Sequence, residues 1–68
     1  MHVTADLFPA RETRAVELPD GATGYELMQR LALAPDVHLL VRGDVPIPID
    51  EKLRDGESVR VIAVVSGG

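Results

Sequence analysis

The residues best suited to chemistry stand last in the sequence, where Ser66 is followed by Gly67 and Gly68. Glycine has no Cβ, so a pair of glycines can pass through a channel too narrow for other residues. Such a segment would present the α-carboxylate of Gly68 to the active site of a partner enzyme. A Ser-Gly-Gly segment is also typical of a flexible linker, which would do no chemistry. The preceding residues must decide between these two interpretations.

The composition limits what else the chain can do. Its 68 residues make one small domain. The sequence has no cysteine, and His2 and His38 are too few for a zinc site, so we expect no bound metal or cofactor. Hydrophobic residues make up 46% but aromatic residues only 3%, which predicts an aliphatic core. No serine or threonine has a recognisable base partner in the sequence, so intrinsic enzymatic activity is not expected.

The charge and hydropathy indicate which partners to expect. The formal net charge is −4, which would repel nucleic acid and an acidic membrane surface and favours a basic partner. The longest apolar run, residues 61–65, is far too short to span a bilayer, and the N-terminus does not resemble a signal peptide. These features predict a cytoplasmic protein that does not bind membranes or nucleic acid. When free, it is expected to be a monomer.

The first half of the chain predicts a hairpin followed by a helix. Residues 2–7 and 13–18 alternate polar and apolar side chains, the period of half-buried strands, with a short polar connection between them. Thr23 and Glu26 then match a capping box, which marks the start of a helix. Apolar residues spaced for one helix face follow, and the helix is expected to end before Pro35.

The second half predicts strands at residues 37–42 and 58–65. Two prolines in residues 45–49 exclude a central strand there, so this segment is expected at an edge or on the surface. Residues 50–54 are expected to form one helical turn, with Leu53 pointing inward.

Together these elements predict an α+β fold: a mixed sheet of four to five strands with one helix packed across it. If the first and last strands lie side by side at the centre, they run parallel, and the architecture is a β-grasp. The expected domain covers residues 1–64, followed by a flexible diglycine tail at residues 65–68.

Several segments resemble the ubiquitin-like sulfur-carrier family, which includes ThiS, MoaD and the small archaeal modifier proteins. The resemblance covers essentially the whole chain, and its most specific part is Leu53-Arg54-Asp55-Gly56 at a fixed distance from the final diglycine. The chain departs from the family at Arg42, where asparagine is commoner. The other matching segments are Gly21-Ala22-Thr23, Val41-Arg42-Gly43, Glu57-Ser58-Val59 and Val65-Ser66-Gly67-Gly68.

The resemblance implies a carrier that is activated at its C-terminus. An ATP-dependent activating enzyme would adenylate Gly68, and sulfur would then replace an oxygen to give a thiocarboxylate. The acceptor would be a thiamin or molybdopterin synthase or a tRNA-thiolating enzyme. The alternative is a protein modifier, in which Gly68 forms an isopeptide bond with lysines of target proteins. ATP would be used by the activating enzyme and not held by the carrier.

A docking surface and one acceptor residue complete the predicted site. If Leu39 and Val41 face the helix, Leu40 points to the opposite face of the sheet. If Val59 and Val61 point inward, Ile62 and Val64 also point to that opposite face. We therefore expect Leu40, Ile62 and Val64 to form an exposed apolar patch beside the tail, where ubiquitin-like proteins bind their activating enzymes. Lys52 is the only lysine, so it is the only side-chain amine that could accept another copy of the chain.

Overall fold

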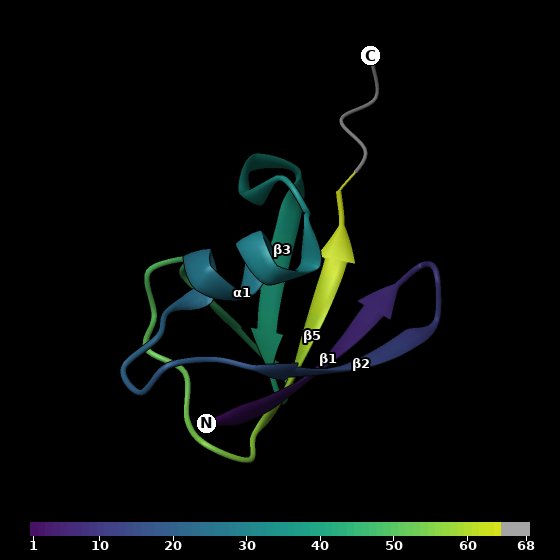
Figure 1. The fold of residues 1–68 in the computed structure, drawn as a ribbon. Helices are drawn as coiled ribbons and strands as arrows, with labels where there is room; N and C mark the ends of the chain where they lie inside the picture. Colours follow the sequence, from purple (N-terminus) through teal and green to yellow (C-terminus); the bar gives the residue numbers. More distant parts are fainter. Residues whose placement is uncertain (65–68) are drawn as a thin grey trace.

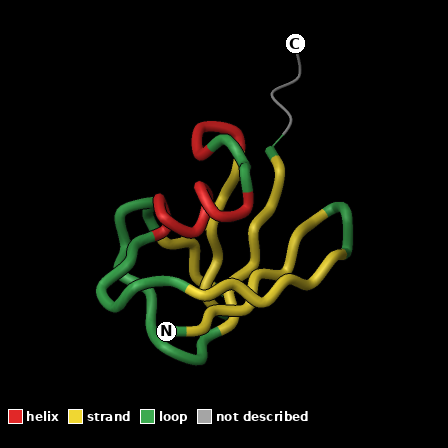
Figure 2. Tube along the Cα trace, viewed as in Figure 1, coloured by secondary structure: helices red, strands yellow, loops and turns green. Residues whose placement is uncertain are grey.

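Five strands and one α-helix make up the fold in a computed structural model that describes residues 1–64. The proposed tail, residues 65–68, therefore lies outside the described residues. Figures 1 and 2 show the arrangement of the elements. In chain order these are β1 (His2–Phe8), β2 (Glu12–Glu17), α1 (Gly24–Leu31), the short 3-10 helix η1 (Pro35–Val37), β3 (His38–Arg42), β4 (Val45–Ile47) and β5 (Ser58–Ala63).

The sheet has the strand order β2-β1-β5-β3-β4. Strands β1 and β5 lie next to each other and run parallel, whereas the other neighbouring pairs are antiparallel. Helix α1 crosses one face of this sheet (Figure 1). The α+β β-grasp prediction is thus confirmed, including the parallel pair at the centre.

Both ends of α1 are fixed by local hydrogen bonds. The predicted capping box is present: the Glu26 carboxylate accepts the backbone N–H of Thr23 at 2.8 Å and also its hydroxyl. These hydrogen bonds lower the pKa of Glu26 below its ordinary value of 4.5. The helix ends at Ala32, which adopts left-handed backbone angles and donates its N–H to the Gln29 carbonyl at 3.1 Å.

An aliphatic core fills the space between α1 and the sheet. Strands β1 and β5 each contribute two side chains, and α1 contributes Leu27, Met28 and Leu31. Because burying one such side chain contributes about 1.5–3 kcal/mol, this cluster is the main source of stability in so small a domain. The buried cluster consists of Val3, Ala5, Leu18, Ala22, Leu27, Met28, Leu31, Leu40, Leu53, Val59 and Val61.

The segment between β4 and β5 departs from the predicted secondary structure. Strand β4 lies at the sheet edge, as its prolines indicated, and Leu53 is buried as expected. The helical turn predicted for residues 50–54 is wrong, because this segment bonds to the start of α1 instead. Lys52 forms a β-bridge with Thr23, and the Leu53 N–H donates to the Ala22 carbonyl at 2.9 Å.

Within residues 1–64, no helix combines the length and apolar character that crossing a bilayer requires.

Candidate functional site

Strand β5 carries the chain toward its last residues at one end of the sheet (Figure 1). It is the middle strand of five, paired along both edges, and its backbone is therefore held on both sides. Just after it, the Val64 N–H donates to the Val37 carbonyl at 2.8 Å, which fixes the point where the described chain stops. The residue that precedes the proposed tail is therefore held in place by a hydrogen bond to η1 and by the paired strand β5 just before it.

Apolar side chains gather on the sheet face opposite α1, near this same end. Leu39 pairs with Ile62 across β3 and β5, and Phe8 pairs with Ile62 across β1 and β5, so the three lie in one cross-strand row. Phe8 is 38% exposed and Leu39 41%, while Ile62 between them is half-buried. By strand alternation Val64 belongs to this face, and it is 51% exposed. We call Phe8, Leu39, Ile62 and Val64 the outer apolar patch.

The prediction that Leu40 belongs to this patch is wrong. Leu40 is only 2% exposed, pairs with the buried Val61 and packs in the core under α1. Its alternate neighbours, His38 and Arg42, share the inner face but stand at the two ends of β3. There their polar groups find partners, the Ala34 carbonyl for His38 and two glutamates for Arg42. Placing these two polar residues on the inner face therefore costs little free energy. The side chains of β3 face the opposite way from the prediction: Leu40 points to the helix, and Leu39 points away from it.

The sequence does not predict two of the patch residues, Phe8 and Leu39. The run from Leu39 to Val41 is apolar on both faces, so its alternation does not indicate which side is buried. The alternation in residues 2–7 predicts that the first strand ends at Leu7, before Pro9, and so does not include Phe8. The pairing of both residues with Ile62 is a long-range feature that the sequence alone does not contain.

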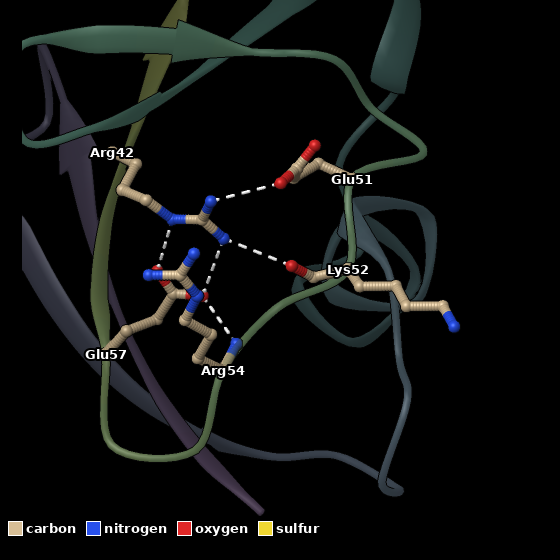
Figure 3. A network of polar contacts seen from close by, with 5 residues as sticks. All are labelled: Arg42, Glu51, Lys52, Arg54 and Glu57. Atoms are coloured by element: carbon tan, nitrogen blue, oxygen red, sulfur yellow. Dashed lines mark hydrogen bonds and ion pairs between the residues drawn. The ribbon is translucent and has the colours of Figure 1, made fainter.

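Arg42 is the centre of a polar network on the inner side of the sheet (Figure 3). Its guanidinium donates two hydrogen bonds to the Glu57 carboxylate, at 2.8 and 3.1 Å, and one to Glu51 at 3.1 Å. It also donates to the Lys52 carbonyl at 3.1 Å, and the Arg54 N–H donates to Glu57 at 2.6 Å. The network ties the end of β3 to the middle of the β4–β5 connection and to its last residue. The arginine at position 42 thus has a structural role.

The charged groups in this network shift each other's pKa values. Burial by itself would raise the pKa of Glu57, but hydrogen bonds from Arg42 and Arg54 outweigh it, and the pKa lies below the ordinary 4.5. The hydrogen bonds that Arg42 donates to Glu57 in turn raise the pKa of Arg42. Because the Glu57 pKa is lower in the folded than in the unfolded chain, its ionised form stabilises the fold above about pH 4.5. That contribution disappears as the pH falls through the folded-state pKa.

We expect Glu57→Gln to lower the free energy of unfolding at neutral pH by about 1–3 kcal/mol, the range for losing a charged hydrogen bond. It should also flatten the loss of stability between neutral pH and acid, as measured by urea denaturation across the pH range. Glu12→Gln is the matched control, because its pair with Arg14 is more than half exposed (58% and 53%), whereas Glu57 is 13% exposed. Equal effects of the two substitutions would contradict a stabilising role for the network.

Lys52 belongs to the β4–β5 connection. This connection runs at the end of the sheet opposite to the one where β5 stops (Figure 1). Its side chain is exposed and points away from the Arg42 network, while its backbone bonds to Arg42 and pairs with Thr23 (Figure 3). The structure therefore does not bring Lys52 together with the patch. As an exposed amine on a fixed backbone, it is accessible to a partner.

Comparison with known proteins gives two matches over most of the chain. An uncharacterized protein of Archaeoglobus fulgidus is 31% identical over 62 residues, which cover 90% of this chain and 91% of that protein. At this identity and coverage, the chain belongs to the same family as the Archaeoglobus protein, whose name states no function. The sulfur carrier protein TtuB of Thermus thermophilus is 26% identical over 57 residues, covering 84% of this chain and 88% of TtuB. No protein-family model matches the chain.

Proposed function

We propose that this protein is a sulfur carrier of the ubiquitin-like ThiS/MoaD-like family, with sulfur borne on the carboxylate of Gly68. The observation that carries the proposal is the similarity to the sulfur carrier TtuB across 84% of the chain. The β-grasp fold supports it, because the central strand β5 leads directly toward residues 65–68.

The chemistry follows from the weak reactivity of a carboxylate toward nucleophiles. A carboxylate oxygen of Gly68 would attack the α-phosphorus of ATP in an activating enzyme, releasing pyrophosphate and forming an acyl-adenylate. Hydrosulfide attack on the acyl carbon would then expel AMP and leave a thiocarboxylate. Since the sequence contains no cysteine, the terminal carboxylate is the position available for sulfur. The sulfur would pass to a thiamin or molybdopterin precursor or to tRNA.

The outer apolar patch is proposed as the surface that docks the activating enzyme. It lies on the face away from α1 and at the end of the sheet where β5 stops. A partner that covers Leu39 and Ile62 would therefore be next to the start of the tail. Extended at about 3.3–3.6 Å per residue, the four residues from Val65 to Gly68 reach roughly 13 Å. This is far enough to enter a nucleotide site while the domain stays docked outside.

ATP–pyrophosphate exchange with the activating enzyme of the same organism tests the proposal. Exchange that depends on both the carrier and ATP is the expected result. No exchange with any activating enzyme of that organism, at carrier concentrations that saturate known pairs, would contradict the proposal.

The same assay tests the docking surface. We expect Leu39→Asp to raise the KM for the carrier about tenfold, the effect of losing roughly 1.4 kcal/mol of binding, with little change in kcat. Val45→Asp is the matched control, since Val45 is 62% exposed but lies on the edge strand β4. Equal KM values for the two variants would show that the enzyme docks elsewhere.

Transfer of Gly68 to lysines of other proteins would use the same acyl-adenylate. That outcome would appear as Gly-Gly remnants on target lysines after proteolysis of host extracts. Chains of linked copies would require Lys52, so Lys52→Arg would abolish them while leaving adenylation unchanged.

A further inference from the structure

The free edge of β2 and the groove beside it form a second surface, distinct from the outer apolar patch. The groove has a volume of about 370 Å³ and is lined by four consecutive β2 residues and two residues at the end of α1. Strand β1 separates β2 from β5, and the groove opens on the helix side of the sheet, whereas the patch lies on the other face. We call this the β2 groove; its lining residues are Arg14, Ala15, Val16, Glu17, Arg30 and Leu31.

Within residues 1–64, the backbone of β2 has hydrogen-bonding groups without a partner along this groove. Met1 and Leu18 exchange both backbone bonds, at 2.7 and 2.8 Å, and in an antiparallel ladder such pairs alternate with pairs that do not bond. Counting along the register, Arg14 and Val16 bond to β1. The N–H and C=O groups of Thr13, Ala15 and Glu17 therefore point outward. This edge can accept another strand.

The opposite edge of the sheet is less suited to this. Strand β4 has only three residues, Val45–Ile47, and its middle residue is Pro46, which has no N–H to donate. Strand β2 has six residues, Glu12–Glu17, and contains no proline. An added strand would therefore pair with β2.

The side chains beside β2 indicate what such a strand must carry. Arg14 and Val16 are in register with the buried Ala5 and Val3, so they point to the helix side, where Arg30 and Leu31 form the other wall. By the same alternation the Glu17 side chain points to the opposite face. On the groove side the lining therefore carries two arginines beside apolar Val16 and Leu31, with Glu12 paired to Arg14 on the same face.

The existing ion pair in the groove is weak enough to be exchanged. The Arg14 Nε lies 3.4 Å from the Glu12 carboxylate, and both side chains are more than half exposed. Such exposed pairs contribute about 0–1 kcal/mol. A carboxylate entering between Arg14 and Arg30 would meet two guanidiniums, and desolvation by the added strand would strengthen its pairing with them.

From these features we propose that the β2 groove binds an extended acidic peptide segment of a partner protein by adding a strand to β2. Alternate side chains of that segment enter the groove, an aliphatic one against Val16 and Leu31 and a carboxylate between the two arginines. Because this surface does not overlap the outer apolar patch, the peptide and the activating enzyme bind at the same time.

The test uses a fluorescein-labelled peptide, Thr-Val-Thr-Asp-Thr-Val-Thr-Asp, and a control peptide with lysine in place of aspartate. Fluorescence polarisation should show saturable binding of the aspartate peptide, weakened about tenfold by Arg30→Glu, an exposed position on α1. Ala15→Pro removes an outward N–H but no bond to β1, and it should abolish binding. Amide shifts in NMR spectra should change at Thr13, Ala15 and Glu17, with ATP–pyrophosphate exchange unaffected by saturating peptide.

Four outcomes would overturn the proposal. These are no saturable binding, equal binding of the lysine peptide, an unchanged affinity in Arg30→Glu, and dimerisation through β2 in sedimentation experiments without peptide. If Ala15→Pro does not fold, Arg30→Glu and the peptide pair still decide the result. Because the readout is peptide binding, its failure is separate from any failure of adenylation.

Discussion

Gly67→Val is expected to lower the rate of adenylation by about 100-fold or more, the cost of misplacing a reacting group by about an ångström. A valine side chain would not fit a channel shaped for a diglycine segment, and the Gly68 carboxylate would stop short of the nucleotide. The thermal stability should stay unchanged, because the substitution alters none of the residues of the described core cluster.

Ser66→Ala is the matched control for this substitution. It changes the same tail but adds no volume, and we expect adenylation close to that of the unaltered protein. Pyrophosphate exchange with both variants, together with their melting curves, measures the effect. Normal adenylation of Gly67→Val would show that the diglycine does not enter a narrow channel.

Gly24→Ala is expected to lower the free energy of unfolding by about 1–3 kcal/mol, the usual cost of overpacking. A Cβ on Gly24 would lie 2.6 Å from the Ile49 carbonyl oxygen and would also collide with Leu40. The Ile49 carbonyl is backbone and cannot rotate aside, so the β4–β5 connection must move off the helix. For a 68-residue domain, whose total stability is about 3–10 kcal/mol, this is a large fraction.

Packing and helix propensity predict opposite changes in the free energy of unfolding for Gly24→Ala, so the experiment decides between them. Helix propensity alone predicts a gain of up to about 1 kcal/mol for alanine in place of glycine in α1. Gln29→Ala, at an exposed position of the same helix, serves as the control and should change stability by less than about 0.5 kcal/mol. Urea denaturation of both variants measures the difference. A Gly24→Ala variant more stable than the unaltered protein would contradict the packing described here.

Local patterns in the sequence were sufficient to predict the fold. Alternation in residues 2–7, the capping box at Thr23 and Glu26, and the prolines near residue 46 each indicate one element through short-range chemistry. A single helix then has few ways to cover the remaining apolar faces, and the β-grasp follows.

Features set by long-range pairing could not be predicted in the same way. Leu40 was assigned to the wrong face because the apolar run around it has no alternation, and only its pairing with Val61 places it in the core. The bonds of Arg42 to Glu51 and Glu57 join residues 9 and 15 positions apart. The β2 groove likewise depends on how the end of α1 packs beside β2, which no local pattern specifies.

The central claim is that Gly68 carries sulfur, and intact-mass spectrometry of the protein purified from its own host tests it most directly. The account predicts a species heavier by the difference between one sulfur and one oxygen atom, with fragment ions that place the change at Gly68. The species should be absent from hosts that lack the activating enzyme. A terminal carboxylate that remains unmodified in all preparations, including those that demonstrably contain the active enzyme and a sulfur donor, would contradict the account.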